Sequence, residues 1–263
     1  MADPVLCDID ARGVATVTLN RPEVNNAYDE ALIRGLLAGL DALEANRDLR
    51  AVVLRGNGRH FQAGADLKWI RSIAPKSQAE NEQASRDTGT AVRRLNELRA
   101  PTVALVQGGC FGGGTGIIAA CDVVIAADNA MFSIAETRWG LMAGIILPQL
   151  ADAIGARQVR RYALTGERFG AEEARRIGLV HEVVPLAELA AAGERIVDQL
   201  LQNAPEANAV TKARALQFAF GRVSDEVFES LVVEHAAKRR SSEGAEGLAS
   251  FVEKRPAAWY RKG

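Results

Sequence analysis

Three short apolar runs constrain the fold of this 263-residue chain more than any other feature of its sequence. They are residues 51–54 (AVVL), 102–106 (TVALV) and 122–126 (DVVIA). Runs of this length without polar alternation are typical of strands that are buried on both faces. Such strands need helices on either side of their sheet, so the chain should contain crossover units rather than form a helical bundle or a β-sandwich.

The N-terminal part of the chain has the pattern of one such unit. Residues 14–19 (VATVTL) mix Val and Thr as strands do, and Asn20, Arg21 and Pro22 form a turn signal after them. Leucine and isoleucine then recur at steps of three and four within residues 29–45. This spacing predicts an amphipathic helix that covers a sheet.

The C-terminal part of the chain differs in composition. From Leu186 onward strand patterns are absent, and segments rich in Ala, Glu and Leu alternate with polar breaks. These segments are too short to enclose a core of their own, so we expect them to pack on the same domain or on a neighbouring subunit. We therefore divide the chain into an α/β core, residues 1–185, and a helical region, residues 186–263.

Charge and cysteine content exclude several classes of partner. The 32 basic and 33 acidic residues give a formal net charge of −1, which provides no general attraction for nucleic acid or an anionic membrane. The N-terminus has no basic segment followed by an apolar run, so we expect a cytoplasmic protein. Cys7, Cys110 and Cys121 lack the spacing of a metal site or a disulfide framework, and we expect free thiols and no metal.

Small residues follow two of the predicted strands. After the first strand, Ala63-Gly64-Ala65-Asp66 leads into a segment that can be helical from Leu67, where Asp66 is placed to cap the helix. After the second strand comes the glycine run of residues 107–122 (QGGCFGGGTGIIAACD), ahead of another helical segment. Glycine allows backbone to approach a ligand, and a helix N-terminus directs unpaired NH groups at it, so this turn can bind an anion.

Two kinds of anion remain possible for the glycine run. The segment from Gly114 to Ala119 fits the relaxed dinucleotide pattern GxGxxA, although no acidic residue ends a following strand at the ribose-binding distance. Taken together, the two loops instead suggest an oxyanion hole with two backbone donors. No GxSxG serine or Cys/His pair is present to act as a nucleophile, and His60, His181 and His235 have no ligand spacing, which favours structural roles.

The ordered motifs resemble the enoyl-CoA hydratase/isomerase (crotonase) superfamily. The residues that carry the resemblance are FQAGADL at 61–67, the glycine run with its continuation to Gly144, and TGERFGAEEARRIGLVHEVVP at 165–185. GLASFVEKRPAAW at 247–259 is similar to the tail of the methylglutaconyl-CoA hydratase branch. The resemblance implies a crotonase-like (ClpP/crotonase) spiral of ββα units, with C-terminal helices that complete a homotrimer or a hexamer made of two trimers.

The resemblance also implies site residues. The NH groups of Ala65 and Gly113 would form the oxyanion hole for an acyl-CoA thioester, and Glu136 would be the catalytic carboxylate. The carboxyl group of Glu136 follows an apolar segment, where desolvation raises a pKa toward neutrality. Substrate and coenzyme A would contact a larger set of residues in the two loops: Ala63, Gly64, Ala65, Asp66, Leu67, Gly112, Gly113 and Gly116.

One position departs from the family pattern. Typical hydratases carry a second glutamate where this chain has Gly116. Water addition needs a base for the water and an acid for Cα, which one carboxylate can supply only through a single water molecule. The resemblance thus implies an enoyl-CoA hydratase acting on a branched or carboxylated substrate such as methylglutaconyl-CoA, with no cofactor beyond the coenzyme A of the substrate. The alternatives are a Δ3,Δ2-enoyl-CoA isomerase or a non-hydrating relative that binds acyl-CoA.

Overall fold

The computed structural model describes residues 3–220, 224–255 and 257. Its larger sheet contains six strands in the order β1-β2-β3-β4-β6-β9, and a smaller sheet has the order β5-β7-β8. The strands of the larger sheet are β1 (Val5–Ile9), β2 (Val14–Leu19), β3 (Ala51–Gly56), β4 (Thr102–Val106), β6 (Val123–Ala127) and β9 (Glu182–Val184). Those of the smaller sheet are β5 (Gly109–Phe111), β7 (Met131–Ser133) and β8 (Phe169–Gly170).

Helices lie between most of these strands, and among the described residues helices are the regular elements after β9. The α-helices are α1 (Glu30–Ala45), α2 (Leu67–Ile73), α3 (Gln78–Glu97), α4 (Gly113–Ala119), α5 (Leu147–Thr165), α6 (Ala171–Arg176), α7 (Leu189–Gln202), α8 (Pro205–Phe220), α9 (Asp225–Arg239) and α10 (Ser242–Val252). The 3-10 helices are η1 (Pro22–Val24), η2 (Glu136–Trp139), η3 (Gly144–Ile146) and η4 (Leu186–Glu188).

The strand predictions agree with this sheet. β2 and β4 have the predicted bounds, and β3 and β6 contain almost all of the other two apolar runs. The ladders from β2 through β9 are parallel, whereas β1 joins β2 antiparallel. All five residues of β4 are buried, because its neighbours are strands and both of its faces are covered.

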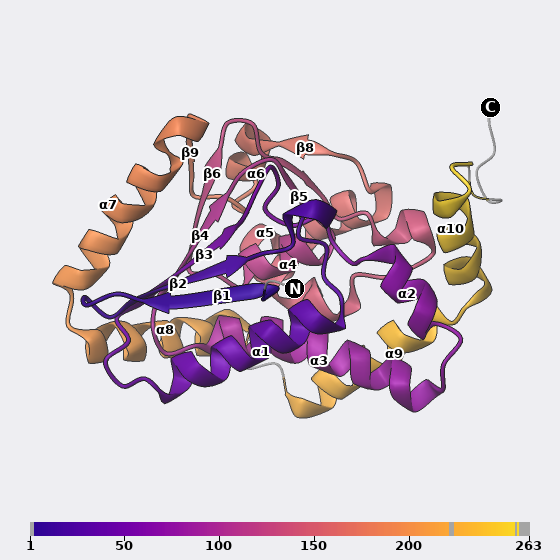
Figure 1. The fold of residues 1–263 in the computed structure, drawn as a ribbon, viewed down its shortest axis with the longest axis horizontal. Coiled ribbons are helices and arrows are strands. Elements are labelled where there is room, and N and C mark those ends of the chain that lie inside the picture. The colour runs from indigo at the N-terminus through magenta and orange to yellow at the C-terminus, as the bar shows by residue number, and fades with distance from the viewer. Residues whose placement is uncertain (1–2, 221–223, 256, 258–263) are drawn as a thin grey trace.

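Two apolar layers lie on opposite faces of the sheet (Figure 1). Alternate strand residues such as Val17, Leu54 and Ala104 pack with α1 and α3, while their neighbours, including Leu105, pack with α7. The predicted amphipathic helix is α1, whose N-cap Asp29 accepts a hydrogen bond from the NH of Leu32. The alternating side chains of each central strand therefore serve both layers, as expected for an α/β fold.

The helices after β9 pack on the same chain. α7 covers one face of the sheet, α9 lies along α3, and α10 lies beside α2 and η2 (Figure 1). The ring of Trp139 in η2 meets that of Phe251 in α10 edge-on, with centroids 5.0 Å apart. Much of the helical region is thus part of the α/β unit. Part of the predicted trimerisation region, residues 221–223, 256 and 258–263, lies outside the described residues.

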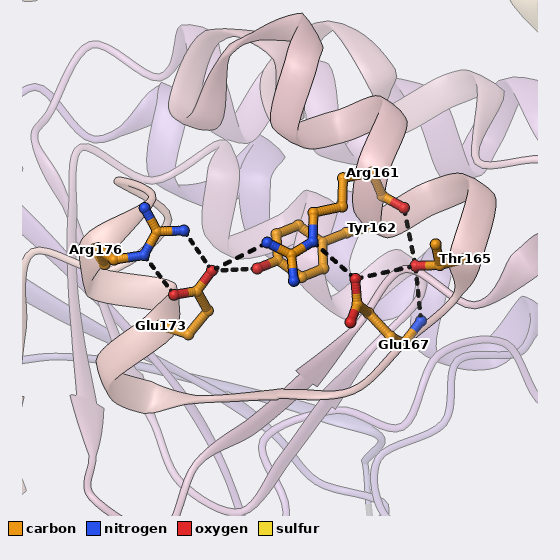
Figure 2. A network of polar contacts seen from close by, with 6 residues as sticks. All are labelled: Arg161, Tyr162, Thr165, Glu167, Glu173 and Arg176. Carbon is orange, nitrogen blue, oxygen red and sulfur yellow. Dashed lines mark hydrogen bonds and ion pairs between the residues drawn. The ribbon is translucent and has the colours of Figure 1, made fainter.

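A polar network joins the end of α5 to α6 (Figure 2). Glu173 accepts a hydrogen bond from the hydroxyl of Tyr162 and pairs with Arg176 at 2.6 Å. Arg161 pairs with Glu167 at 2.9 Å. The Tyr162 ring packs on Phe169 of β8, with 4.2 Å between centroids. Phe169 in turn stacks on Phe132 of β7, the strand that leads to Glu136, with 5.7 Å between centroids.

Candidate functional site

The two small-residue loops meet beside each other, as the sequence predicted. Gln62 pairs with Cys110 in an isolated parallel bridge, which joins the first loop to β5. Gly64 and Gly112 both have positive φ angles, 86° and 50°. A Cβ on Gly112 would lie only 3.7 Å from the Gly64 Cα, so glycine at these positions allows the two backbones to touch.

Two backbone NH groups at this junction have the orientation of hydrogen-bond donors to a ligand. Ala65 forms a parallel bridge with Tyr28, in which Gly64 O accepts from Tyr28 NH and Asp66 NH donates to Tyr28 O. In such a bridge the NH of the middle residue, Ala65, points away from Tyr28. Gly113 is the first residue of α4, so its NH has no acceptor within the helix. Both residues are partly exposed, which leaves these donors accessible.

Glu136 lies against the same junction. The NH of Gly112 donates to Ser133 O at 2.9 Å, which fixes the glycine run beside the strand that precedes Glu136. A Cβ on Gly112 would lie 3.2 Å from Glu136 Oε1. The Oε2 atom is shielded from solvent and has no hydrogen-bond partner among the described residues. Burial raises the pKa of the Glu136 carboxyl to about 7. It can therefore both accept and release a proton near neutral pH.

The position of the missing second glutamate is filled by another side chain. Gly116 is buried, and a Cβ there would lie 2.3 Å from Ile146 Cγ2. Ile146 belongs to η3 and lines the cavity, whereas Gly116 is not among the residues that line it. The structure therefore does not bring Gly116 together with the other predicted substrate-binding residues. The gap in the family pattern is closed by packing rather than left open to substrate.

A cavity of about 710 Å³ opens onto the two NH groups and Glu136. The predicted substrate-contacting residues that line it are Ala63, Gly64, Ala65, Asp66, Leu67, Gly112 and Gly113. Its volume lies in the range of small-molecule sites. Asp66 caps α2, as predicted, by accepting from the NH groups of Lys68 and Trp69 at 2.9 and 3.4 Å.

Three cavity residues were missed by reasoning from the sequence. The Tyr28 ring packs so closely on Gly113 that a Cβ added there would lie 2.6 Å from the ring. The same ring meets that of Trp69 edge-on. His235 and Arg239 of α9 also line the cavity, although the sequence favoured a structural role for His235 and did not single out Arg239. No local pattern marks these residues, because α9 reaches the cavity through its packing on distant segments, α3 and η3.

The remaining candidates have structural roles. His60 Nδ1 accepts from the NH of Gly109 at 2.7 Å, and His181 Nδ1 accepts from the NH of Val124 at 3.0 Å. Cys110 and Cys121 are buried free thiols. Among the described residues there is no cluster of three His, Cys, Asp or Glu side chains that suits a metal. None of the described helices combines the length and the hydropathy needed to cross a bilayer.

The dinucleotide interpretation of the glycine run is not supported. A Cβ on Gly114 would lie 2.6 Å from Gln62 Oε1, so this glycine and Gly116 permit close packing of α4 rather than an approach to a phosphate. The turn instead presents Gly113 NH beside Ala65 NH and a protonatable carboxylate. Backbone donors and a protonatable carboxylate are the groups that stabilisation of an oxyanion with proton transfer would require.

The chain belongs to the enoyl-CoA hydratase/isomerase family, whose model matches residues 10–262. It is 37% identical to a hydroxycinnamoyl-CoA hydratase-lyase of Pseudomonas fluorescens over 82% of this chain and 78% of the relative. A mitochondrial Δ(3,5)-Δ(2,4)-dienoyl-CoA isomerase of Dictyostelium discoideum is 31% identical over 94% of this chain and 87% of the relative.

Solved structures confirm the crotonase fold. An enoyl-CoA hydratase from Mycobacterium avium superposes with a TM-score of 0.87 at 32% identity, covering 99% of this chain and 100% of that one. An enoyl-CoA hydratase/isomerase from Xanthobacter autotrophicus has a TM-score of 0.87 at 29% identity, with coverage of 99% and 100%. The predicted superfamily, its α/β fold with C-terminal helices and an enzymatic activity on acyl-CoA are thereby confirmed.

Proposed function

We propose that this enzyme hydrates a 2-enoyl-CoA and that Glu136 performs both proton transfers. The observation that carries the proposal is the Glu136 carboxyl, with a pKa of about 7, beside Gly112 and without a hydrogen-bond partner at Oε2 among the described residues. Asp66 is the other carboxylate on the cavity wall, and it is engaged at the N-terminus of α2.

The reaction would proceed through an enolate. The thioester oxygen would accept hydrogen bonds from the NH groups of Ala65 and Gly113. Glu136 takes a proton from water as the hydroxyl adds to Cβ, and the electron pair moves onto the thioester oxygen. Glu136 then returns the proton to Cα as the enolate collapses. Each oxyanion donor contributes roughly 3 kcal/mol to such a transition state.

An isomerase is the second candidate, and the packing at Gly116 favours it. Because Ile146 occupies the space beside Gly116, the described residues place no second carboxylate at that position to activate water. One carboxylate suffices to move a proton between two carbons of the same substrate. Coenzyme A would be part of the substrate in both reactions, with no resident cofactor, and the assembly would be a homotrimer or hexamer.

The substrate would carry a branched or carboxylated acyl group. This proposal is supported by the resemblance of residues 247–259 to methylglutaconyl-CoA hydratases. Pro256 and residues 258–259 of that segment lie outside the described residues.

The decisive experiment follows the products from 2-enoyl-CoA and 3-enoyl-CoA thioesters by NMR. Hydration predicts a 3-hydroxyacyl-CoA from the 2-enoyl substrate, and Glu136→Gln should abolish its formation. Migration of the double bond without water addition would establish the isomerase instead. Turnover of neither substrate would contradict both.

A further inference from the structure

Arg239 is a buried cation at the wall of the substrate cavity. Its side chain is only 2% exposed, yet it lines the cavity. The guanidinium uses Nη2 to donate to the Asn81 carbonyl and to the Ser85 hydroxyl. Its Nε atom is shielded from solvent and has no partner among the described residues.

The described part of the chain supplies no carboxylate that pairs with Arg239, although many of its other arginines, such as Arg94 and Arg176, are paired. Residues outside it, 1–2, 221–223, 256 and 258–263, include no Asp or Glu. A buried charge that is left unpaired is costly, and proteins almost always pair such a charge or bind a ligand with it. No carboxylate side chain neutralises Arg239 in the described structure, so an anion bound in the cavity would stabilise it.

Residues of α3 and α9 surround Arg239 at the wall of the cavity. Thr88 and Val92 line the cavity from α3, and Ser85 lies on the same face of that helix, one turn before Thr88. His235, one turn before Arg239 on α9, places its Nδ1 2.9 Å from the Ser85 hydroxyl. The exposed cations Lys68, Arg138 and Arg168 line the same cavity.

The charges of the site are connected through Tyr28. Its pKa is raised by burial and by the charge of Glu136, and it is lowered by the charge of Arg239. Tyr28 packs against Gly113, and all three residues, Tyr28, Gly113 and Arg239, line the same cavity. An acyl chain whose thioester lies at Gly113 would thus pass Tyr28 and approach Arg239.

We propose that Arg239 is the receptor for a carboxylate at the far end of the acyl group, so that the substrate is the coenzyme A thioester of a dicarboxylic enoic acid. The proposal rests on the function proposed above and names the residue that selects the substrate. The guanidinium keeps N–H donors at Nε and Nη1, because Nη2 is used by Asn81 and Ser85, and each of these donors can bind a carboxylate oxygen. Neutral enoyl chains would leave the buried cation unpaired.

The test compares two substrates of similar size, glutaconyl-CoA and the neutral 2-pentenoyl-CoA. We expect the wild-type enzyme to prefer glutaconyl-CoA in kcat/KM. Arg239→Gln should lose roughly 30-fold or more on glutaconyl-CoA. It should retain or improve its turnover of the pentenoyl substrate. Arg239→Met provides a second, apolar replacement, and the melting temperature of each variant verifies that it folds.

A matched control comes from the next residue of the chain. Arg240 is exposed, lies outside the cavity and donates to Gln78 Oε1. Arg240→Gln removes the same charge from almost the same place in the sequence. It should leave the ratio of the two kcat/KM values unchanged, whereas an equal change in both variants would overturn the assignment to Arg239.

Binding separates this inference from the proposed function. Glutaryl-CoA and butyryl-CoA are saturated and cannot be hydrated, so calorimetry measures recognition alone. Tighter binding of glutaryl-CoA that Arg239→Gln abolishes supports the receptor even if no enoyl-CoA is turned over. Equal binding of both thioesters would overturn it even if hydration is observed. A variant that loses assembly or stability while keeping the same selectivity would also overturn it, because Arg239 would then pair with a neighbouring subunit.

Discussion

Replacing Gly116 by glutamate tests whether the closed position beside α4 limits the chemistry of this enzyme. A Cβ at residue 116 would lie 2.3 Å from Cγ2 and 2.5 Å from Cβ of Ile146, and Ile146 is only 2% exposed. Contacts this short require a shift of η3 or of α4. Overpacking of this kind costs about 1–3 kcal/mol, and burial of an unpaired carboxylate adds to that cost.

Removing the obstructing side chain should relieve the clash. Ile146→Ala alone should destabilise the protein by about 2–4 kcal/mol through the cavity it creates. The double variant Gly116→Glu/Ile146→Ala should be more stable than the sum of the two single effects, by at least about 1 kcal/mol, because the residues are in contact. Urea unfolding measures all three variants, and Gly116→Ala, which adds the Cβ without charge, is the control.

The activity of the same variants decides the chemical question. With the space opened, the new glutamate can supply a second proton-transfer group, a contribution of roughly 100-fold or more. Hydration of crotonyl-CoA by the double variant should therefore exceed that of Ile146→Ala. A Gly116→Glu single variant as stable as wild type would refute the packing argument. A double variant no faster than Ile146→Ala would show that a second carboxylate is not what limits hydration.

Four further outcomes are expected. Glu136→Gln should abolish turnover. Because the raised pKa of about 7 means that ionised Glu136 destabilises the folded protein by up to about 3 kcal/mol, the variant should be more stable than wild type above pH 7 but not below pH 4.5. Urea unfolding measures this difference, and equal stability of the two proteins at both pH values would contradict it. Gly113→Pro removes the backbone NH donor, so kcat should be about 100-fold or more lower than in Gly113→Ala, which brings a Cβ against Tyr28 but keeps the NH. Equal kcat values of the two variants would show that the NH group takes no part in catalysis. Deletion from Ser241 onward removes the packing of α10 on Trp139, so it should break the proposed trimer and reduce turnover. Sedimentation of the native chain as a monomer would argue against the proposed assembly. Burial lowers the pKa of His235 to about 3, so the unfolded chain takes up a proton first as the pH falls, and the free energy of unfolding should decline from pH 6.5 toward 3. His235→Asn should flatten that decline, and an unchanged dependence of the unfolding free energy on pH would exclude His235 as its source.

Local sequence patterns predicted the sheet well. The runs at 51–54 and 102–106 are buried strands because each lies between two other strands and has helices on both faces. The helix predicted over residues 29–45 is α1, with Asp29 as its cap. These features follow from hydrophobic period and capping chemistry, which depend only on neighbours along the chain.

The candidate site was predicted in part. Glycine at 64 and 112 indicated close backbone approach, and the two loops do lie in contact. The catalytic roles of Ala65, Gly113 and Glu136 remain predictions, although the structure brings these residues together. Gly116 was predicted to contact substrate, but it packs against Ile146 instead. No pattern in the sequence relates these two residues, because their contact depends on how η3 is placed over α4.

The sequence by itself determined the α/β class, the two glycine-rich strand exits and the family to which the chain belongs, since these are recorded in local period and in ordered motifs. Only the tertiary structure decided which side chains share the cavity. Arg239 follows Ser85 by 154 residues, and nothing in the composition of α9 distinguishes a surface arginine from a buried one. Burial is a property of packing between distant segments, so the recognition site proposed at Arg239 can form only once α9 has packed on α3.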